Sequence, residues 1–344
     1  VYHEECVLEI VAEKAKHEYG DLKLPFDATN HEIVLHFAQT ITPEDEVLGI
    51  MDGADNELVP PELAMAGAFC NRKLRVIAFS GVETGAILHW SYSRIIKNPG
   101  QETRPITGML MFQKEIPVYN QKIQVRYPED SPVVFGYSNE CPEPKISSHE
   151  GHIVYDWFSP AMPAIASEWS MPALVNLVPI CRFATASLET FTLDIPSPGE
   201  VEVKIPAIDG AGAGTFDEKL ERCYRYVSEN IKLISIKPVY RNFKPSPVSR
   251  TLAQRSGDQL DLGQLLRVLL HQEGISSDLV FYSSRGDYTT GDVVSMSLMD
   301  AVAVVATHEK SGREVWLDIM ASDSQVAGCS PVKAITGSVS VMVA

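Results

Sequence analysis

A short acidic segment followed by a leucine-rich run constrains this chain more than any other part of it. Ser256-Gly257-Asp258-Gln259-Leu260-Asp261 leads directly into Leu262-Gly263-Gln264-Leu265-Leu266-Arg267-Val268-Leu269-Leu270. The apolar residues of the run follow helical spacing, which predicts a buried helix that begins near Gln259 or Leu260. Gly274 can end this helix, because glycine is the usual residue just beyond a helix C-terminus.

The rest of the second half places helices before strands. Thr215 or Asp217 can cap an earlier helix, whose apolar face includes Leu220, Tyr224 and Val227. After the buried helix come three short apolar runs of strand type, Leu279–Tyr282, Ala301–Ala306 and Glu314–Asp318. Helices followed by antiparallel strands are typical of an α+β domain, so we expect that class here.

The first half reads as an antiparallel β-sandwich. Short apolar or alternating runs are separated by Pro, Gly, Asp or Asn at intervals typical of sandwiches. These runs are Cys6–Val11, Glu32–Phe37, Leu74–Phe79, Ala86–Tyr92 and Ile123–Tyr127. The Pro-rich stretch from Trp157 to Pro179 is predicted to form an extended strap over a surface, because proline interrupts ladders and helices.

Linker-like composition separates the two halves. Ile195-Pro196-Ser197-Pro198-Gly199 and Gly210-Ala211-Gly212-Ala213-Gly214 are rich in Pro and Gly. The sequence therefore predicts a sandwich domain over residues 1–195, a linker over 196–214 and an α+β domain over 215–344.

Charge excludes some classes of partner. The chain of 344 residues has a formal net charge of −16, and residues 1–200 hold 28 acidic against 14 basic side chains. Such an acidic half repels nucleic acid and anionic lipid, so neither is expected as a partner. No run of 18 apolar residues occurs, and hence no membrane-spanning segment is expected. The chain starts at Val1 without a recognisable export signal, which favours a mature or trimmed fragment.

Six cysteines are spread along the chain, and none lies in a C-x-x-C pair. Zinc knuckles and thioredoxin-type motifs are therefore not indicated. The sequence leaves the disulfide state and the oligomeric state open.

The segment around Gln259 resembles the active-site segment of the transglutaminase-like branch of the papain-fold superfamily. In that family the pattern is Gly-Asp-Cys-x-Asp at the start of a buried helix, and Gly257, Asp258 and Asp261 match it. Gln259 stands where the family has its nucleophilic cysteine. A glutamine amide has no thiolate, so the resemblance implies the scaffold of an enzyme without its nucleophile.

The other two catalytic positions lie further along the chain. The family shows Asn-His before an apolar strand, and Asp300 aligns at the base position. Trp316-Leu317-Asp318 resembles the strand that carries the orienting Asp. The resemblance therefore implies a vestigial triad of Gln259, Asp300 and Asp318. It also implies a vestigial cleft lined by Gly257, Asp258, Gln259, Asp261, Asp300 and Trp316.

The first half resembles a companion, a β-rich domain of unknown function that commonly precedes transglutaminase-like domains in bacterial proteins. The resemblance rests on Thr40–Pro43, Ala86–Tyr92 and the strap from Trp157 to Pro179. Proteins of this kind are usually exported, which implies a periplasmic or cell-surface location by analogy alone.

Four carboxylates, Asp258, Asp261, Asp300 and Asp318, could gather near one helix end. They could bind a hard cation or act as an acid/base pair in glycoside hydrolysis. The structural interpretation is that Asp258 and Asp261 cap the helix, and it is the one we adopt. We likewise interpret His149 and His152 as solvated loop residues, so no metal site and no cofactor is predicted.

These observations favour a non-catalytic transglutaminase-like protein that serves in binding, scaffolding or assembly at the cell envelope. Its partner would be a peptide, a polysaccharide or a protein. Two alternatives remain: an enzyme that uses the four carboxylates, and a purely structural subunit that pairs through sheet edges. An open cleft above Gln259 would favour ligand binding, whereas a filled one would favour the structural role.

Overall fold

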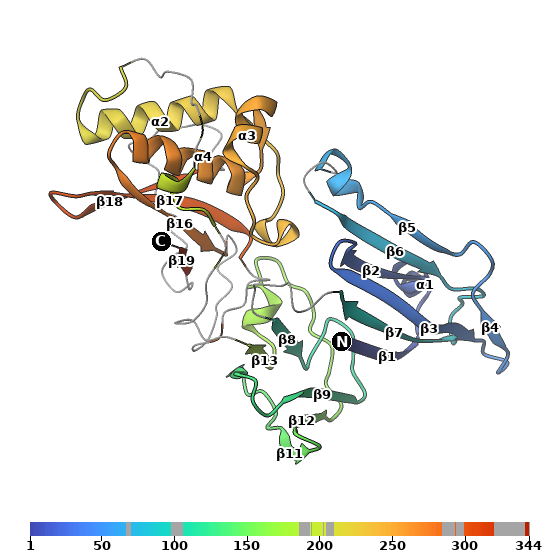
Figure 1. The fold of residues 1–344 in the computed structure, drawn as a ribbon. Coiled ribbons are helices and arrows are strands. Elements are labelled where there is room, and N and C mark those ends of the chain that lie inside the picture. The colour runs from blue at the N-terminus through green and yellow to red at the C-terminus, as the bar shows by residue number, and fades with distance from the viewer. Residues whose placement is uncertain are drawn as a thin grey trace. The chain divides into compact units, whose positions relative to one another are not determined.

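The protein has an α+β fold built mostly from antiparallel sheets (Figure 1). The structure is a computed structural model, and it describes residues 1–66, 70–97, 106–185, 193, 195–201, 203, 210–283, 293, 299–319 and 341–343. The chain divides into two compact units, residues 1–102 and 103–344.

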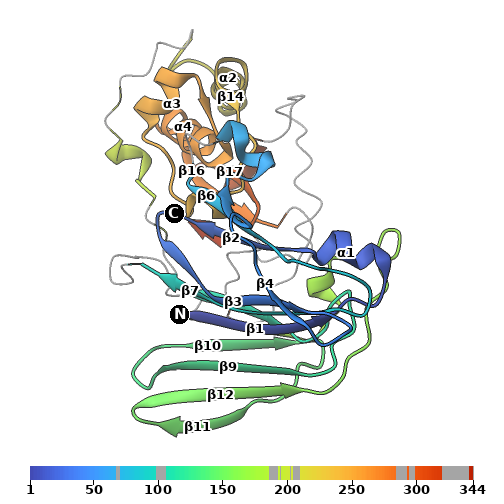
Figure 2. The same cartoon turned by 90° about the vertical axis from the view of Figure 1, so that its right-hand side faces the viewer.

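The first unit contains two antiparallel sheets and one short helix. One sheet has the strand order β1-β7-β3-β4 and the other the order β2-β6-β5; Figure 2 shows β1, β7 and β3 side by side. The elements are β1 (Tyr2–Glu9), α1 (Glu13–Tyr19), β2 (Asp21–Asp27), β3 (His31–Ile41), β4 (Val47–Gly49), β5 (Asp55–Leu58), β6 (Arg72–Ala78) and β7 (Ile87–Ile96).

Side chains from both sheets share one core, which makes this unit a sandwich. Strands β2 and β6 supply Leu24, Phe26 and Ile77, while β7 supplies Leu88 and Trp90. Along β1, half-buried side chains alternate with exposed ones, as expected for a strand with one face on a core. The predicted antiparallel β-rich character of this part of the chain is confirmed.

The second unit begins with two further three-stranded antiparallel sheets, of orders β10-β13-β8 and β11-β12-β9. Aromatic side chains fill the space they enclose, and Phe135 of β10 stacks on Tyr155 of β12 with ring centroids 4.4 Å apart. The strands are β8 (Thr107–Met111), β9 (Gln121–Pro128), β10 (Val134–Ser138), β11 (Lys145–His149), β12 (His152–Ser159) and β13 (Ile180–Ala184).

The predicted strap starts later than the sequence suggested. Trp157 lies within β12, where it pairs with Ile123 of β9 and is fully buried. The prediction was wrong for Trp157 to Ser159, because the prolines begin only at Pro160 and the residues before it are free to join a ladder. From Pro160 to Pro179 the chain is irregular apart from a β-bridge between Met162 and Val118 and a short 3₁₀ turn, Leu174–Asn176.

The C-terminal part packs helices against a sheet of order β18-β17-β16-β19. Thr215 caps α2 through its side chain, as predicted. The helices are α2 (Phe216–Asn230), α3 (Val248–Gln254) and α4 (Gln259–Gln272), and the strands are β14 (Lys232–Leu233), β15 (Ser256–Gly257), β16 (Ser276–Tyr282), β17 (Ala301–His308), β18 (Arg313–Asp318) and β19 (Val341–Val343).

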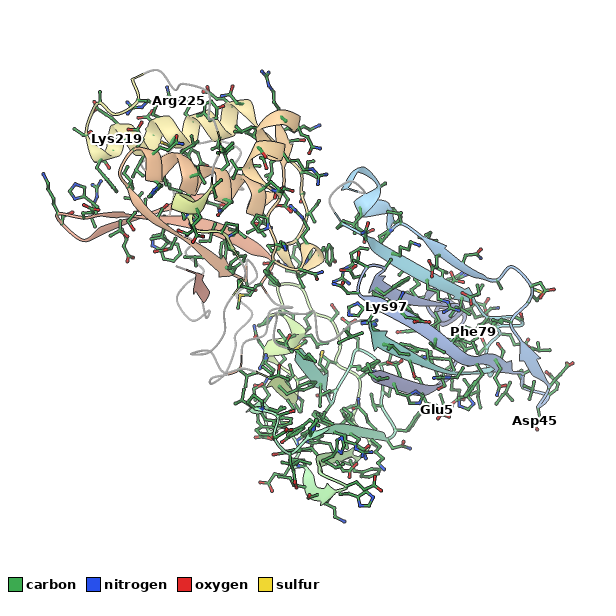
Figure 3. All side chains as sticks on the ribbon, viewed as in Figure 1. Glu5, Asp45, Phe79, Lys97, Lys219 and Arg225 are labelled. Carbon is green, nitrogen blue, oxygen red and sulfur yellow. The ribbon has the colours of Figure 1, made fainter. Side chains whose placement is uncertain are left out.

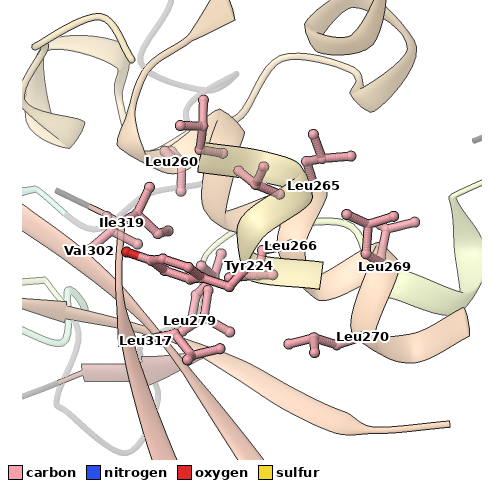
Figure 4. Close-up of a cluster of buried hydrophobic side chains, with 14 of the residues drawn as sticks. Tyr224, Leu260, Leu265, Leu266, Leu269, Leu270, Leu279, Val302, Leu317 and Ile319 are labelled. Carbon is pink, nitrogen blue, oxygen red and sulfur yellow. The ribbon is translucent and has the colours of Figure 1, made fainter. Parts of the chain in front are cut away.

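Helix α4 lies in the centre of this part, as the sequence predicted. Its side chains are buried from Gln259 to Leu270, and its leucines pack with Tyr224 and with strand residues such as Leu279 and Leu317 (Figure 4). Gly263 allows the close approach, because a Cβ at this position would lie 2.8 Å from the Leu279 side chain and 3.1 Å from that of Ile319.

A buried acid holds the C-terminal end of α4. Glu273, the residue after its last turn, accepts hydrogen bonds from the main-chain N–H of Gly212 and from Arg222. The Lys219 ammonium lies 3.6 Å from the same carboxylate. These contacts tie α4 to α2 and to the loop that precedes α2.

Part of the predicted linker belongs to the α+β core. Val201 and Val203 of the predicted linker pack against that core, as does Ile195 just before it, and Gln264 of α4 donates a hydrogen bond to the Pro196 carbonyl. The predicted boundary between residues 195 and 215 stays a prediction, since residues 186–192 and 204–209 lie outside the described residues. Among the helices of the described residues, none is long and apolar enough to cross a membrane.

Candidate functional site

Two aspartates cap the start of α4, and each accepts a hydrogen bond from the main-chain N–H of the other. The Asp258 carboxylate accepts hydrogen bonds of 2.9 Å from the main-chain N–H groups of Leu260 and Asp261. The Asp261 carboxylate accepts in turn from the N–H of Asp258. This arrangement is a capping box, and it confirms the structural interpretation of both aspartates.

A buried arginine neutralises part of this charge. Nη1 of Arg241 lies 2.7 Å from Oδ2 of Asp258 and 2.7 Å from Oδ1 of Asp261. The Arg241 side chain is only 8% exposed and both carboxylates are fully buried. Nη2 of the same guanidinium binds the Ser246 hydroxyl, and the Ser246 N–H donates to Asp261. The cluster thus joins the loop before α3 to the first turn of α4.

Two buried carboxylates beside one guanidinium leave an excess negative charge. Burial raises the pKa of Asp258 from 3.8 to about 6, and the neighbouring Asp261 adds to this, while Arg241 opposes it. Asp258 is therefore the group that takes up a proton as the pH falls towards 6. Its contribution to stability is largest at low pH and is lost as the pH rises through that value.

Within the described residues, the side chain of Gln259 makes hydrogen bonds only with the main chain. Its Nε2 donates to the carbonyl oxygens of Asp300, at 2.9 Å, and of Ile236, at 3.3 Å. Its Oε1 accepts from the Val302 N–H at 2.9 Å. The residue is 3% exposed, and both amide hydrogens and one lone pair of the oxygen are used. Gln259 therefore joins the start of α4 to the beginning of β17.

The β17–β18 register decides which side chains share a face. The last described pair is Ala303 with Asp318, so Asp318 lies on the sheet face of Ala303 and Ala301. That face also carries Tyr282 and Trp316, whereas the next residue, Val302, belongs to the core beneath α4. Gln259 hydrogen-bonds to the start of β17, just beyond this last pair. Its partners are main-chain groups of Asp300 and Val302, which flank Ala301.

Asp300 precedes β17, and its N–H donates to the Tyr282 carbonyl. Burial raises the pKa of the Tyr282 hydroxyl, and the charges of Asp318 and Asp300 raise it further, so both carboxylates lie near this phenol. The Asp318 carbonyl accepts a hydrogen bond of 2.5 Å from the Tyr224 hydroxyl. Asp300, Trp316 and Asp318 are half-buried, whereas Gly257, Asp258, Gln259 and Asp261 are buried.

Gly257 is required by close packing at the same place. A Cβ at this position would lie 2.7 Å from the Asp261 Cβ, which is closer than side chains approach. Its carbonyl accepts a hydrogen bond from Ile234, next to the parallel pairing of β14 with β15. Any larger residue would displace the carboxylate that caps α4.

Among the described residues, few groups near this site could act as a nucleophile or a metal ligand. Within the described ranges no cysteine opens a helix, and the Cys223 thiol in α2 is buried, which raises its pKa to about 12. The described part of the chain holds no cluster of three or more His, Cys, Asp or Glu side chains suited to a metal ion. Cys329 falls outside the described residues.

Sequence reasoning missed Arg241, Tyr224 and Tyr282, although all three contact the predicted positions or lie beside them. Arg241 is 17 residues from Asp258 and lies in a short 3₁₀ turn, so no periodic pattern links the two. The one available signal was chemical: two aspartates three residues apart at a buried helix start need a cation.

We expect Arg241→Met to destabilise the protein by about 3–5 kcal/mol, because it leaves two buried carboxylates without their cation. The loss should be larger at pH 8 than at pH 5, where Asp258 can carry a proton. Urea unfolding at the two pH values measures both effects.

Arg225→Met is the matched control, since the exposed Arg225–Glu221 pair of α2 is worth at most about 0.5 kcal/mol. Equal destabilisation by the two substitutions, or a loss from Arg241→Met that does not depend on pH, would contradict the ion-pair account.

Comparisons with known proteins gave a family match to the first half of the chain and a match of the fold to a solved structure. Residues 1–166 match the family model of a domain of unknown function with solved structures, DUF3857. The fold is similar to the crystal structure of a putative protease from Parabacteroides distasonis ATCC 8503, with a TM-score of 0.77 and 21% sequence identity. The match covers 92% of this chain but 63% of that one. A search of curated proteins gave no match. The first half thus carries a DUF3857 match, and the likeness to the crystal structure shows the fold alone.

Proposed function

We propose that this chain is a non-catalytic transglutaminase-like protein. In it the residue at the nucleophile position, Gln259, has a structural role. The proposal rests chiefly on the hydrogen bonds of Gln259, whose amide links α4 to the main chain of Asp300, Val302 and Ile236. In an active enzyme of this design, the corresponding side chain must be free to attack a substrate.

The pairing of β17 with β18 indicates which residue stands where the family has its catalytic His. The family pattern is Asn-His before the strand, and Asp318 is the residue that would orient the His. Since Ala301 shares a sheet face with Asp318, we infer that Asp300 corresponds to the Asn and Ala301 to the His. Alanine has no ionisable group, and an aspartate is not the neutral base that imidazole supplies near pH 7, so both assignments favour a protein without cysteine-type catalysis.

Burial of the helix start favours assembly or scaffolding over capture of a ligand at this point. Gly257, Asp258, Gln259 and Asp261 are all buried, and the aspartate oxygens are engaged by the capping box and by Arg241. The same engagement weighs against the alternative of an enzyme built on these carboxylates. A partner would therefore meet the half-exposed Asp300 and Trp316 or other surfaces.

A location at the cell envelope belongs to the same proposal, because β-rich companion domains of this kind usually occur in exported bacterial proteins. Fractionation of cells that express the full-length gene should place the protein outside the cytoplasm. Recovery in the cytoplasmic fraction alone would contradict that location.

Proteolysis is the second candidate, favoured by the name of the Parabacteroides distasonis protein. We expect no hydrolysis of broad peptide pools and no amine incorporation into a glutamine-containing peptide. Both assays should give the rate of buffer alone. Turnover that disappears in Gln259→Ala would refute the non-catalytic proposal, since it would show that this residue supports chemistry.

Restoring the three groups tests the alignment itself. Gln259→Cys combined with Ala301→His should create a thiol of lowered pKa at the start of α4, because the helix dipole and a facing imidazole stabilise the thiolate. Gln259→Cys combined with Asp300→His should not. The rate of alkylation by iodoacetamide as a function of pH measures the thiol pKa in each variant.

Gln259→Cys alone is the control for the effect of the helix. A lowered pKa in the Asp300→His variant but not in the Ala301→His variant would support the alignment of Asp300 with the base. An ordinary thiol in every variant would show that α4 does not correspond to the family's catalytic helix.

A further inference from the structure

Two histidines converge on one serine on the outer face of the first unit. His3 of β1 lies opposite Ser93 of β7 in the antiparallel register. The pairing of β3 with β7 shifts between Leu35 and Phe37, which leaves His36 as the extra residue of a β-bulge. Bulges redirect side chains, and this one brings His36 over Ser93. Strand β7 lies between the two histidine-bearing strands in the sheet.

The nitrogen atoms of both rings point at the same oxygen. Nδ1 of His3 lies 3.1 Å and Nε2 of His36 lies 2.8 Å from the Ser93 hydroxyl oxygen. A hydroxyl has one proton to donate, so at most one of the two rings can accept from it. In the neutral state the other ring must donate its own N–H. The arrangement thus brings two imidazole nitrogens together at one polar point.

The spacing of the rings matches that of a shared zinc ion. The centroids of His3 and His36 are 5.3 Å apart. Two imidazoles on one tetrahedral zinc, with Zn–N bonds of about 2.0–2.1 Å, have their centroids about 5 Å apart. Little rearrangement would therefore be needed for both nitrogens to bind one ion. Both histidines are exposed, so an ion can enter and water can complete the coordination.

The surrounding charge favours a cation over an anion. Residues 1–102 hold 17 acidic and 8 basic side chains. A third histidine on this face, His89, is engaged elsewhere, because its Nε2 lies 2.8 Å from the Glu5 carboxylate and its ring packs edge-on against Phe37. Glu5 is labelled on β1 in Figure 3. His89 therefore offers a control on the same surface.

We propose that His3 and His36 form a zinc site on this sheet face, with Ser93 or water as further ligands. Imidazole is a preferred ligand of zinc, and a site that keeps exchangeable positions can also accept a group from a partner. The inference rests on the first unit alone and does not depend on the proposed function of the second.

Calorimetric titration of the chain with zinc chloride at pH 7.5 tests the proposal. We expect saturable binding of one ion, weakened at least tenfold by His3→Ala and by His36→Ala. His36→Gln repeats the test with a more conservative side chain, and thermal unfolding in a chelator shows whether each variant is folded. His89→Ala and Ser93→Ala should keep most of the affinity, because water can replace a hydroxyl ligand.

The rival location is the β11–β12 hairpin, where His149 pairs directly with His152. Affinity that falls in His149→Ala but not in His36→Ala would overturn the proposal, as would the absence of saturable binding in the wild-type chain. In histidine NMR spectra, zinc should shift the ring signals that disappear in His3→Ala and His36→Ala. Shifts confined to other histidines would also overturn it.

Discussion

The buried ion cluster of Arg241 with Asp258 and Asp261 is the interaction on which the C-terminal part depends. It satisfies the free N–H groups at the start of α4 and, through Ser246, fixes the loop that leads into α3. An isolated carboxylate in this environment would be expensive, because burial disfavours its charge. The Arg241 guanidinium stabilises two such carboxylates, at the N-cap and in the first turn of α4.

That cluster also determines what Gln259 can do. With Asp258 and Asp261 held by Arg241, the first side chain of α4 points at the start of β17 and completes the hydrogen bonding of its main chain. Through these hydrogen bonds Gln259 joins the helix to the sheet. A buried amide that is hydrogen-bonded in this way contributes about 1 kcal/mol per hydrogen bond to stability.

Much of this could be predicted from the sequence, because the relevant signals are local. The capping aspartates, the leucine spacing of α4 and the Thr215 cap follow from residues three or four positions apart. The partner Arg241 could not be predicted, since its contact crosses a loop without periodicity. The sequence also could not decide whether Asp300 or Ala301 corresponds to the base, because a shift of one residue in a strand reverses the face of every side chain. The strap was misplaced because Trp157 precedes the first proline rather than following it.

The contacts at the two ends of α4 affect how this part of the molecule unfolds locally. Glu273 binds the loop before α2 and the Lys219 and Arg222 side chains at one end, while Arg241 binds the aspartates at the other. A helix usually frays from its termini, yet here each terminus is anchored by a buried charge that would be stranded by partial opening. The amide hydrogens of α4 should therefore exchange with solvent together rather than turn by turn, as one cooperative foldon that includes the neighbouring loops.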